Sequence, residues 1–107
     1  MNPSEWDVQV LRTPEALAQG VIPLQMSRAW KPSMVVVLPF VGETRITGIG
    51  MIAPVVVTAL DASLRPLMKF ILKPGKTIRM PRDTVHVVEM HPWAVQPKDF
   101  LFVRPYM

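Results

Sequence analysis

Short apolar runs, separated by proline and glycine, set the pattern of hydrophobic and polar positions along this chain. The run Met34–Leu38 is apolar at every position and mostly valine, which predicts a strand buried on both faces. Residues 55–60 and 84–90 predict further strands, while 67–72 places apolar residues on one face and lysine on the other. With a last strand at 100–103, the pattern predicts a mainly β fold, a compact sandwich or barrel of about eight short strands.

One short helix is predicted near the N-terminus. Thr13 is a favourable N-cap, Pro14 suits the first helical turn, and Gly20 supplies a left-handed stop. The next segment, 21–33, has no clear period, so we expect a loop packed by its own side chains. The helix over 13–19 is therefore the only substantial one expected.

Two glycine-containing segments predict special backbone geometry. Gly48 interrupts a strand pattern at 44–51, which indicates a bulge or the close approach of another backbone. Pro74 and Gly75 stand where a type II turn needs them. Residues 77–80 are therefore expected to pair back across this turn on the preceding strand.

Composition favours one folded domain spanning residues 1–107. Half of the 107 residues are hydrophobic and 19% are charged, which disfavours disorder. The absence of cysteine excludes disulfides and thiolate metal sites. The first seven residues carry two acids and no apolar stretch, so they predict no signal peptide, and no apolar run is long enough to span a bilayer. We expect a protein of the cytoplasm or of a virion, without a membrane partner.

The net charge of +4 is distributed unevenly, and one segment, 65–82, forms what we call the basic ribbon. Its members are Arg65, Lys69, Lys73, Lys76, Arg79 and Arg82, with no acid among them. The ribbon is either the solvated outer face of a hairpin or a contact surface for phosphate backbones or an acidic protein. Phe70 is expected to point inward, which leaves no exposed aromatic for base stacking. Nucleic acid is therefore a possible partner but not the favoured one.

Candidate catalytic residues form no recognisable pattern. No serine stands in a nucleophile elbow, and no carboxylates are paired beyond Glu5 and Asp7. His86, Glu89 and His91 resemble a ligand set, but strand alternation places His86 opposite the other two. A histidine hydrogen-bonded to backbone or water is the simpler interpretation. We predict no enzymatic activity, no metal and no cofactor.

Four aromatic side chains are candidates for anchoring a partner protein. They are Trp6, Trp30, Trp93 and Tyr106. Aromatic anchors dominate many protein interfaces, and a domain this small cannot bury all of its apolar surface. We expect the segment around Trp6 or the segment 104–107 to lie in such a contact, and we expect the chain not to be a simple monomer.

Read in order, several segments resemble the family called domain of unknown function 192. The resemblance is carried by Thr13, Pro14, Glu15 and Gly20, by Met34–Leu38 and Pro39, by Met51, Pro54 and Asp61, and by Val87, Val88, Glu89, Met90, Pro92 and Trp93. It covers nearly the whole chain and implies a small, mainly β, uncharacterised domain. Ile52, Ala53 and Val56 stand where the family has lysine, asparagine and aspartate. Those are polar groups that a shared ligand site would need.

Three functions are consistent with these features. The first is a non-enzymatic structural or interaction protein in a larger assembly, for example a virion capsid-associated or decoration protein. The second is a small module that binds nucleic acid or an acidic partner through the basic ribbon. The third is a small-molecule-binding domain. The loss of the family's polar groups favours the first.

Overall fold

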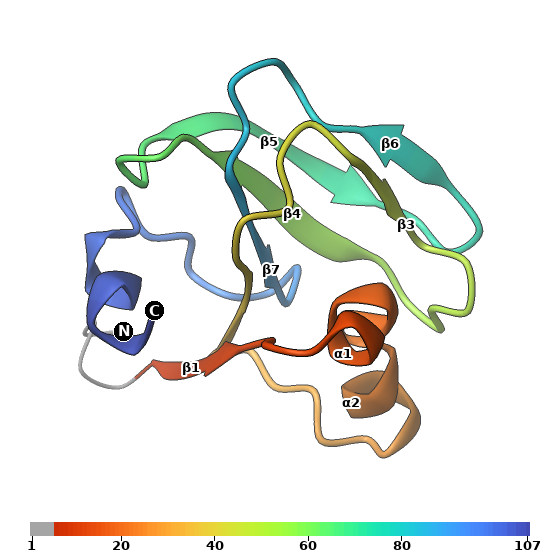
Figure 1. Ribbon diagram of the computed structural model, residues 1–107. Coiled ribbons are helices and arrows are strands. Elements are labelled where there is room, and N and C mark those ends of the chain that lie inside the picture. Colours follow the sequence, from red (N-terminus) through yellow and green to blue (C-terminus); the bar gives the residue numbers. More distant parts are fainter. Residues whose placement is uncertain (1–5) are drawn as a thin grey trace.

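The computed structural model describes residues 6–107, in which seven strands form two sheets (Figure 1). The strands are β1 (Asp7–Val10), β2 (Met34–Leu38), β3 (Arg45–Thr47), β4 (Val55–Leu60), β5 (Pro66–Leu72), β6 (Thr77–Arg79) and β7 (His86–Met90). The larger sheet has the order β1-β2-β7-β4-β5, and the smaller one pairs β3 with β6. The mainly β class is confirmed. Most of the segment expected not to be a signal peptide, residues 1–5, lies outside the described residues.

Strand β7 lies in the middle of the larger sheet, between β2 and β4. The sheet is antiparallel except for the parallel pair β1 and β2. Every residue of β2, β4 and β7 is buried. A strand covered on both faces needs apolar side chains at nearly every position, which explains the continuous valine-rich runs. The prediction for β2 is therefore confirmed.

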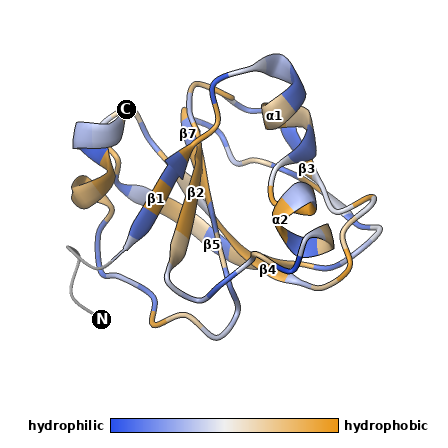
Figure 2. Cartoon of the chain, turned by 90° about the horizontal axis from the view of Figure 1, so that it is seen from below, coloured by the Kyte–Doolittle hydropathy of each residue, from blue (hydrophilic) through white to orange (hydrophobic). Residues whose placement is uncertain are grey.

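Different segments cover the two faces of this sheet. On one side, the helical face, lie helices α1 (Pro14–Gln19) and α2 (Ile22–Met26) and the β3–β6 pair. On the other side, the C-terminal face, lies the 3-10 helix η2 (Leu101–Tyr106). Figure 2 shows these helices on opposite sides of β1 and β2. Neighbouring residues of the central strand, Val87 and Val88, point into the two separate cores. Within residues 6–107, no helix has the length and apolar character that a membrane crossing requires.

Helix α1 forms for the reasons that the sequence indicates. The Thr13 hydroxyl accepts a hydrogen bond from the Ala16 N–H at 3.1 Å, and Pro14 occupies the first turn. Gly20 ends the helix with a φ of 53°, and its N–H donates to the Ala16 carbonyl at 2.9 Å. This predicted helix is confirmed.

The segment expected to be a loop contains a second helix, α2, so that expectation is wrong. Pro23 stands in its first turn, where a missing N–H has little effect. The buried Gln25 then holds α2 onto the loop before β4. Its Nε2 donates to the Ala53 carbonyl at 3.0 Å, and the Ile52 N–H donates to its Oε1 at 2.8 Å. Because the buried residue of this helix is polar, the segment lacks the apolar spacing that indicates a helix.

The C-terminal segment expected to be a strand at 100–103 is the 3-10 helix η2 instead. The Leu101 N–H donates to the Asp99 carboxylate at 3.1 Å where the helix begins. Phe100 and Val103 are both fully buried. Their spacing of three matches one turn of a 3-10 helix, whereas a strand would place them on opposite faces.

Strand β6 pairs with β3, and not with β5 as the turn between them predicts. The turn itself is confirmed, because Gly75 has a φ of 79° and the Lys76 N–H donates to the Lys73 carbonyl at 3.1 Å. The Gly48 backbone lies so close to this turn that a Cβ there would collide with the Lys73 carbonyl oxygen. The close backbone approach expected at Gly48 is therefore confirmed, and it brings the β3 segment beside β6.

Candidate functional site

Two of the predicted anchors, Trp30 and Trp93, meet in one surface groove of about 440 Å³, which we call the aromatic groove. Its walls are Trp30, Ala53, Pro54, Ile71, Lys73, His91, Pro92 and Trp93. These residues come from four separate segments of the chain. Their convergence is a product of the tertiary fold, and no local pattern in the sequence signals it.

His91 lies between the two tryptophans. Its ring centroid is 6.1 Å from that of Trp30 and 5.1 Å from that of Trp93. The His91 Nδ1 accepts a hydrogen bond from the Trp93 backbone N–H at 3.2 Å. Burial lowers the pKa of His91, which favours an uncharged ring at neutral pH. Trp93 is 84% exposed, so its indole presents a large apolar surface to solvent.

Strand β5 contributes to the groove and forms one edge of the larger sheet. Within residues 6–107 it pairs with β4 alone, which leaves its outer edge without a partner strand. Such an edge presents a row of free backbone N–H and C=O groups. Side chains two residues apart share a face, so Lys69 lies on the same face as Ile71 and Lys73, which line the groove. Ile71 is 57% exposed.

All six basic members of the ribbon are exposed, but they do not form one continuous surface. Its first three members lie within β5 or next to its ends. Its last three lie in the turn, in β6 of the smaller sheet, and just after β6. Arg79 stands directly opposite Arg45 of β3, so the β6 half forms a basic patch of its own. Phe70 is half-buried against the core, as expected. The ribbon thus divides between two sheets.

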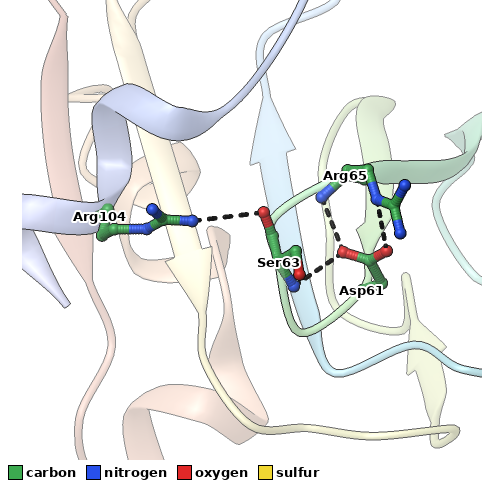
Figure 3. A network of polar contacts seen from close by, with 4 residues as sticks. All are labelled: Asp61, Ser63, Arg65 and Arg104. Carbon is green, nitrogen blue, oxygen red and sulfur yellow. Dashed lines mark hydrogen bonds and ion pairs between the residues drawn. The ribbon is translucent and has the colours of Figure 1, made fainter.

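Arg65, the first member of the ribbon, is engaged within the chain (Figure 3). Its Nε lies 3.2 Å from Oδ2 of Asp61, and its backbone N–H donates to Oδ1 at 2.9 Å. The backbone hydrogen bond is the main cause that lowers the pKa of Asp61. Arg104 donates to the Ser63 carbonyl at 3.4 Å, which ties η2 to the same turn. Of the next two members, Lys73 lines the aromatic groove and Lys69 lies on β5 two residues before Ile71, and neither forms an ion pair within residues 6–107.

The other two predicted anchors lie elsewhere. Trp6 is 6% exposed and stacks on Phe102, with ring centroids 5.9 Å apart. The expectation that Trp6 is a surface anchor is wrong, because the C-terminal segment folds over it. Tyr106 is 49% exposed at the end of η2 and is not part of the aromatic groove.

The two histidines and Glu89 do not converge as a ligand set. Within residues 6–107, no three histidine, cysteine, aspartate or glutamate side chains are placed to hold one metal ion. The His86 Nδ1 accepts a hydrogen bond from the Phe40 backbone N–H at 3.0 Å, as expected for a structural histidine. Burial lowers the pKa of His86, which favours the neutral ring that accepts this bond.

Glu89 is the one buried carboxylate within residues 6–107, whereas the sequence indicated it only as a weak metal-ligand candidate and as part of the family resemblance. It lies on β7 opposite Val36 and Val57 and is 3% exposed. Its Oε1 has no hydrogen-bond partner, and no ion pair joins it to a basic side chain within residues 6–107. Burial raises the pKa of Glu89 to about 7, against the opposing effect of a hydrogen bond from the Val21 backbone. An acid between the buried apolar residues Val88 and Met90 is the signal that could have revealed it.

A second cavity, of about 240 Å³, opens beside this carboxyl on the helical face, and we call it the Glu89 pocket. The end of α1, the segment Gly20–Val21, strand β3 and Met51 enclose it. Gly20 is essential to this geometry, because a Cβ there would stand 2.8 Å from Oε1 of Glu89. Gly20 therefore both ends the helix and makes room for the acid.

Comparison with known proteins bears on the fold. The crystal structure of a protein of unknown function from Novosphingobium aromaticivorans is similar, with a TM-score of 0.61 and 13% identity. The match covers 80% of this chain and 63% of that one, so this chain spans less than two thirds of that protein's length. No family model and no curated protein matches the sequence. The resemblance to domain of unknown function 192 stays a prediction.

Proposed function

We propose that this protein is an interaction module that binds an extended, acidic segment of a partner protein along β5 and in the aromatic groove. The observation that carries the proposal is Trp93, which is 84% exposed at a groove of about 440 Å³. Exposed apolar surface with aromatic anchors is typical of protein contact sites. The proposal combines two functions that the sequence predicts, a component of a larger assembly and a module that binds an acidic partner.

The open edge of β5 supports an extended partner. A segment that adds to a sheet edge satisfies the free backbone groups, and its alternate side chains enter pockets on one face. Along β5 that face carries Ile71 and leads into the aromatic groove. A strand added here would therefore place an apolar side chain beside Trp93.

The charges beside the groove support an acidic partner. Lys69 and Lys73 are exposed on this face, and no acidic side chain lines the groove. Opposite charges across an interface guide association and select the partner. A second copy of the chain paired along β5 would bring lysines near lysines, which is unfavourable. The division of the basic ribbon between two sheets supports a protein partner over a nucleic acid.

The test is fluorescence anisotropy with the full chain and a labelled nine-residue peptide of alternating glutamate and valine with a central leucine. We expect micromolar affinity that weakens as salt is added. Trp93→Ala should weaken binding at least tenfold, which corresponds to about 1.4 kcal/mol. Lys69→Glu should weaken binding as well. Tyr106→Ala, which removes an exposed aromatic outside the groove, is the matched control and should bind like the wild type.

Three results would contradict the proposal. Trp93→Ala could bind the peptide as well as the wild type, or a peptide with lysine in place of glutamate could bind equally well. A single-stranded oligonucleotide could bind more tightly than the acidic peptide. Light scattering on the same samples reports self-association, and a dimer lost in Trp93→Ala would assign the groove to a second copy instead.

A further inference from the structure

A second site lies in the Glu89 pocket, which shares no wall residue with the aromatic groove. The proposed interaction makes no use of it. Glu89 belongs to the central strand and its side chain reaches the pocket from the middle of the sheet. The remainder of the fold does not need an acid at this position, since its cross-strand neighbours Val36 and Val57 are apolar.

Apart from a hydrogen bond from the Val21 backbone, the carboxyl of Glu89 lacks the partners that usually accompany a buried acid. A buried charge is costly unless it is paired and hydrogen-bonded. The side chain is 3% exposed, its Oε1 has no hydrogen-bond partner, and it forms no ion pair within residues 6–107. A perturbed acid beside a cavity is a recognised mark of a binding site. The missing element is a positively charged hydrogen-bond donor.

The rest of the pocket determines the shape of a suitable ligand. Besides Gly20 and Glu89, its walls are mostly apolar, with polar side chains at three positions. The apolar wall residues are Leu17, Ala18, Val21, Leu38, Ile46 and Met51, and the polar ones are Gln19, Arg45 and Thr47. The volume is about 240 Å³. Since a water molecule takes ~30 Å³ of liquid, this space holds about eight waters, or an amine of about four or five carbons. A divalent metal is a poor match, because it requires several oxygen ligands and Glu89 has no second acid beside it.

We propose that the Glu89 pocket binds a small primary ammonium ion with a short aliphatic body. The ammonium group donates to the Glu89 carboxyl and supplies its missing countercharge. The aliphatic body packs against the apolar walls on the helical face. Gly20 leaves space for the carboxyl, because a Cβ there would stand 2.8 Å from Oε1.

Ligand binding should depend on pH, because the ammonium ion competes with a proton for the same carboxyl. The elements that surround Glu89 bring one other charged side chain to the pocket, Arg45 of β3, which is exposed and forms no ion pair with Glu89. With a pKa of about 7, the ionised fraction of Glu89 rises about tenfold between pH 6 and pH 8. Affinity for the ammonium ion should therefore rise about tenfold over this range.

The test uses n-butylamine as the probe and amide NMR spectra of the full chain as the readout. At pH 8 we expect saturable shifts at Gly20, Val21 and Ile46. 1-Butanol, which has nearly the same shape but no charge, should bind at least tenfold more weakly. Glu89→Gln keeps the size of the side chain and should reduce butylamine affinity at least tenfold, while the dispersed spectrum shows that the variant is folded.

Several outcomes would overturn the proposal. They are equal binding of butanol and butylamine, unchanged affinity in a folded Glu89→Gln variant, shifts confined to other regions, or no saturation with butylamine. If Glu89→Gln does not fold, butylamine affinity of the wild type measured over a pH series decides whether the carboxyl is the binding group. An affinity that is flat between pH 6 and pH 8 rejects the carboxyl as the binding group. None of these measurements depends on the aromatic groove.

Discussion

The two faces of the larger sheet are packed in contrasting ways. The C-terminal face is closed by aromatic side chains, with Phe100 fully buried and Trp6 stacked on Phe102. The helical face is covered by two helices of six and five residues and by a two-stranded sheet. It contains a buried acid and a cavity of about 240 Å³.

The difference is that one face buries mainly apolar side chains while the other also buries an acid beside a cavity. Dense apolar packing around Phe100 on the C-terminal face contributes free energy of folding. The helical face contributes less free energy of folding, because a buried acid with an unsatisfied oxygen is unfavourable. Proteins often retain such local conflicts at binding sites. Three changes, ordered by the size of the expected effect, test this division.

The largest effect is expected on the C-terminal face. Phe100→Ala should lower the free energy of unfolding by about 3–5 kcal/mol, because it leaves a cavity in a closed core. Urea unfolding followed by circular dichroism measures the change. Leu101→Ala is the control, since Leu101 is the next residue but is 51% exposed. Similar losses in the two variants would show that this face is not the closed core described.

The second effect is the pH dependence of stability on the helical face. Glu89 has an ordinary pKa of 4.5 when unfolded and about 7 when folded, so the native state binds more protons between these values. The free energy of unfolding therefore falls as the pH rises through this window and levels off above it. By linkage, the total fall in the free energy of unfolding is about 3 kcal/mol. Urea unfolding at several pH values from 4.5 to 8 measures it.

Glu89→Gln should lack this decline and is the reference for it. His86 and His91 have lowered pKa values, so they give the opposite slope below pH 6.5. Both histidines are present in the variant, and their effect cancels in the difference between the two proteins. Parallel pH profiles for wild type and variant would show that the Glu89 carboxyl is not desolvated.

The smallest effect is expected at the edge of the helical face. Thr13→Ala removes the N-cap of α1 and should lower the free energy of unfolding by about 1 kcal/mol. Thr44→Ala, at an exposed threonine outside the helices, should change it little. A loss near 3 kcal/mol at Thr13 would mean that the short helix is as tightly coupled to the core as the C-terminal segment is.

Sequence reasoning was most accurate where the deciding forces are local. Thr13, Pro14 and Gly20 act within one short helix, and Gly75 acts within its own turn. It was wrong where a distant partner decides the outcome. Gln25 holds α2 through bonds to a loop 27 and 28 residues away, and Trp6 is buried under a segment from the other end of the chain.

The mainly β class, the fully buried strand β2 and the capped helix α1 can be read from the amino-acid sequence, because burial on two faces and end-capping leave short-range patterns. The sequence also supplied Trp30 and Trp93 as candidate anchors. That these two share a groove while Trp6 does not depends on tertiary contacts, and so does the place of Glu89 beside a cavity without an ion-pair partner among residues 6–107. Exposure and the pKa of an acid depend on which distant segments pack around a residue, and those contacts have no fixed spacing along the chain.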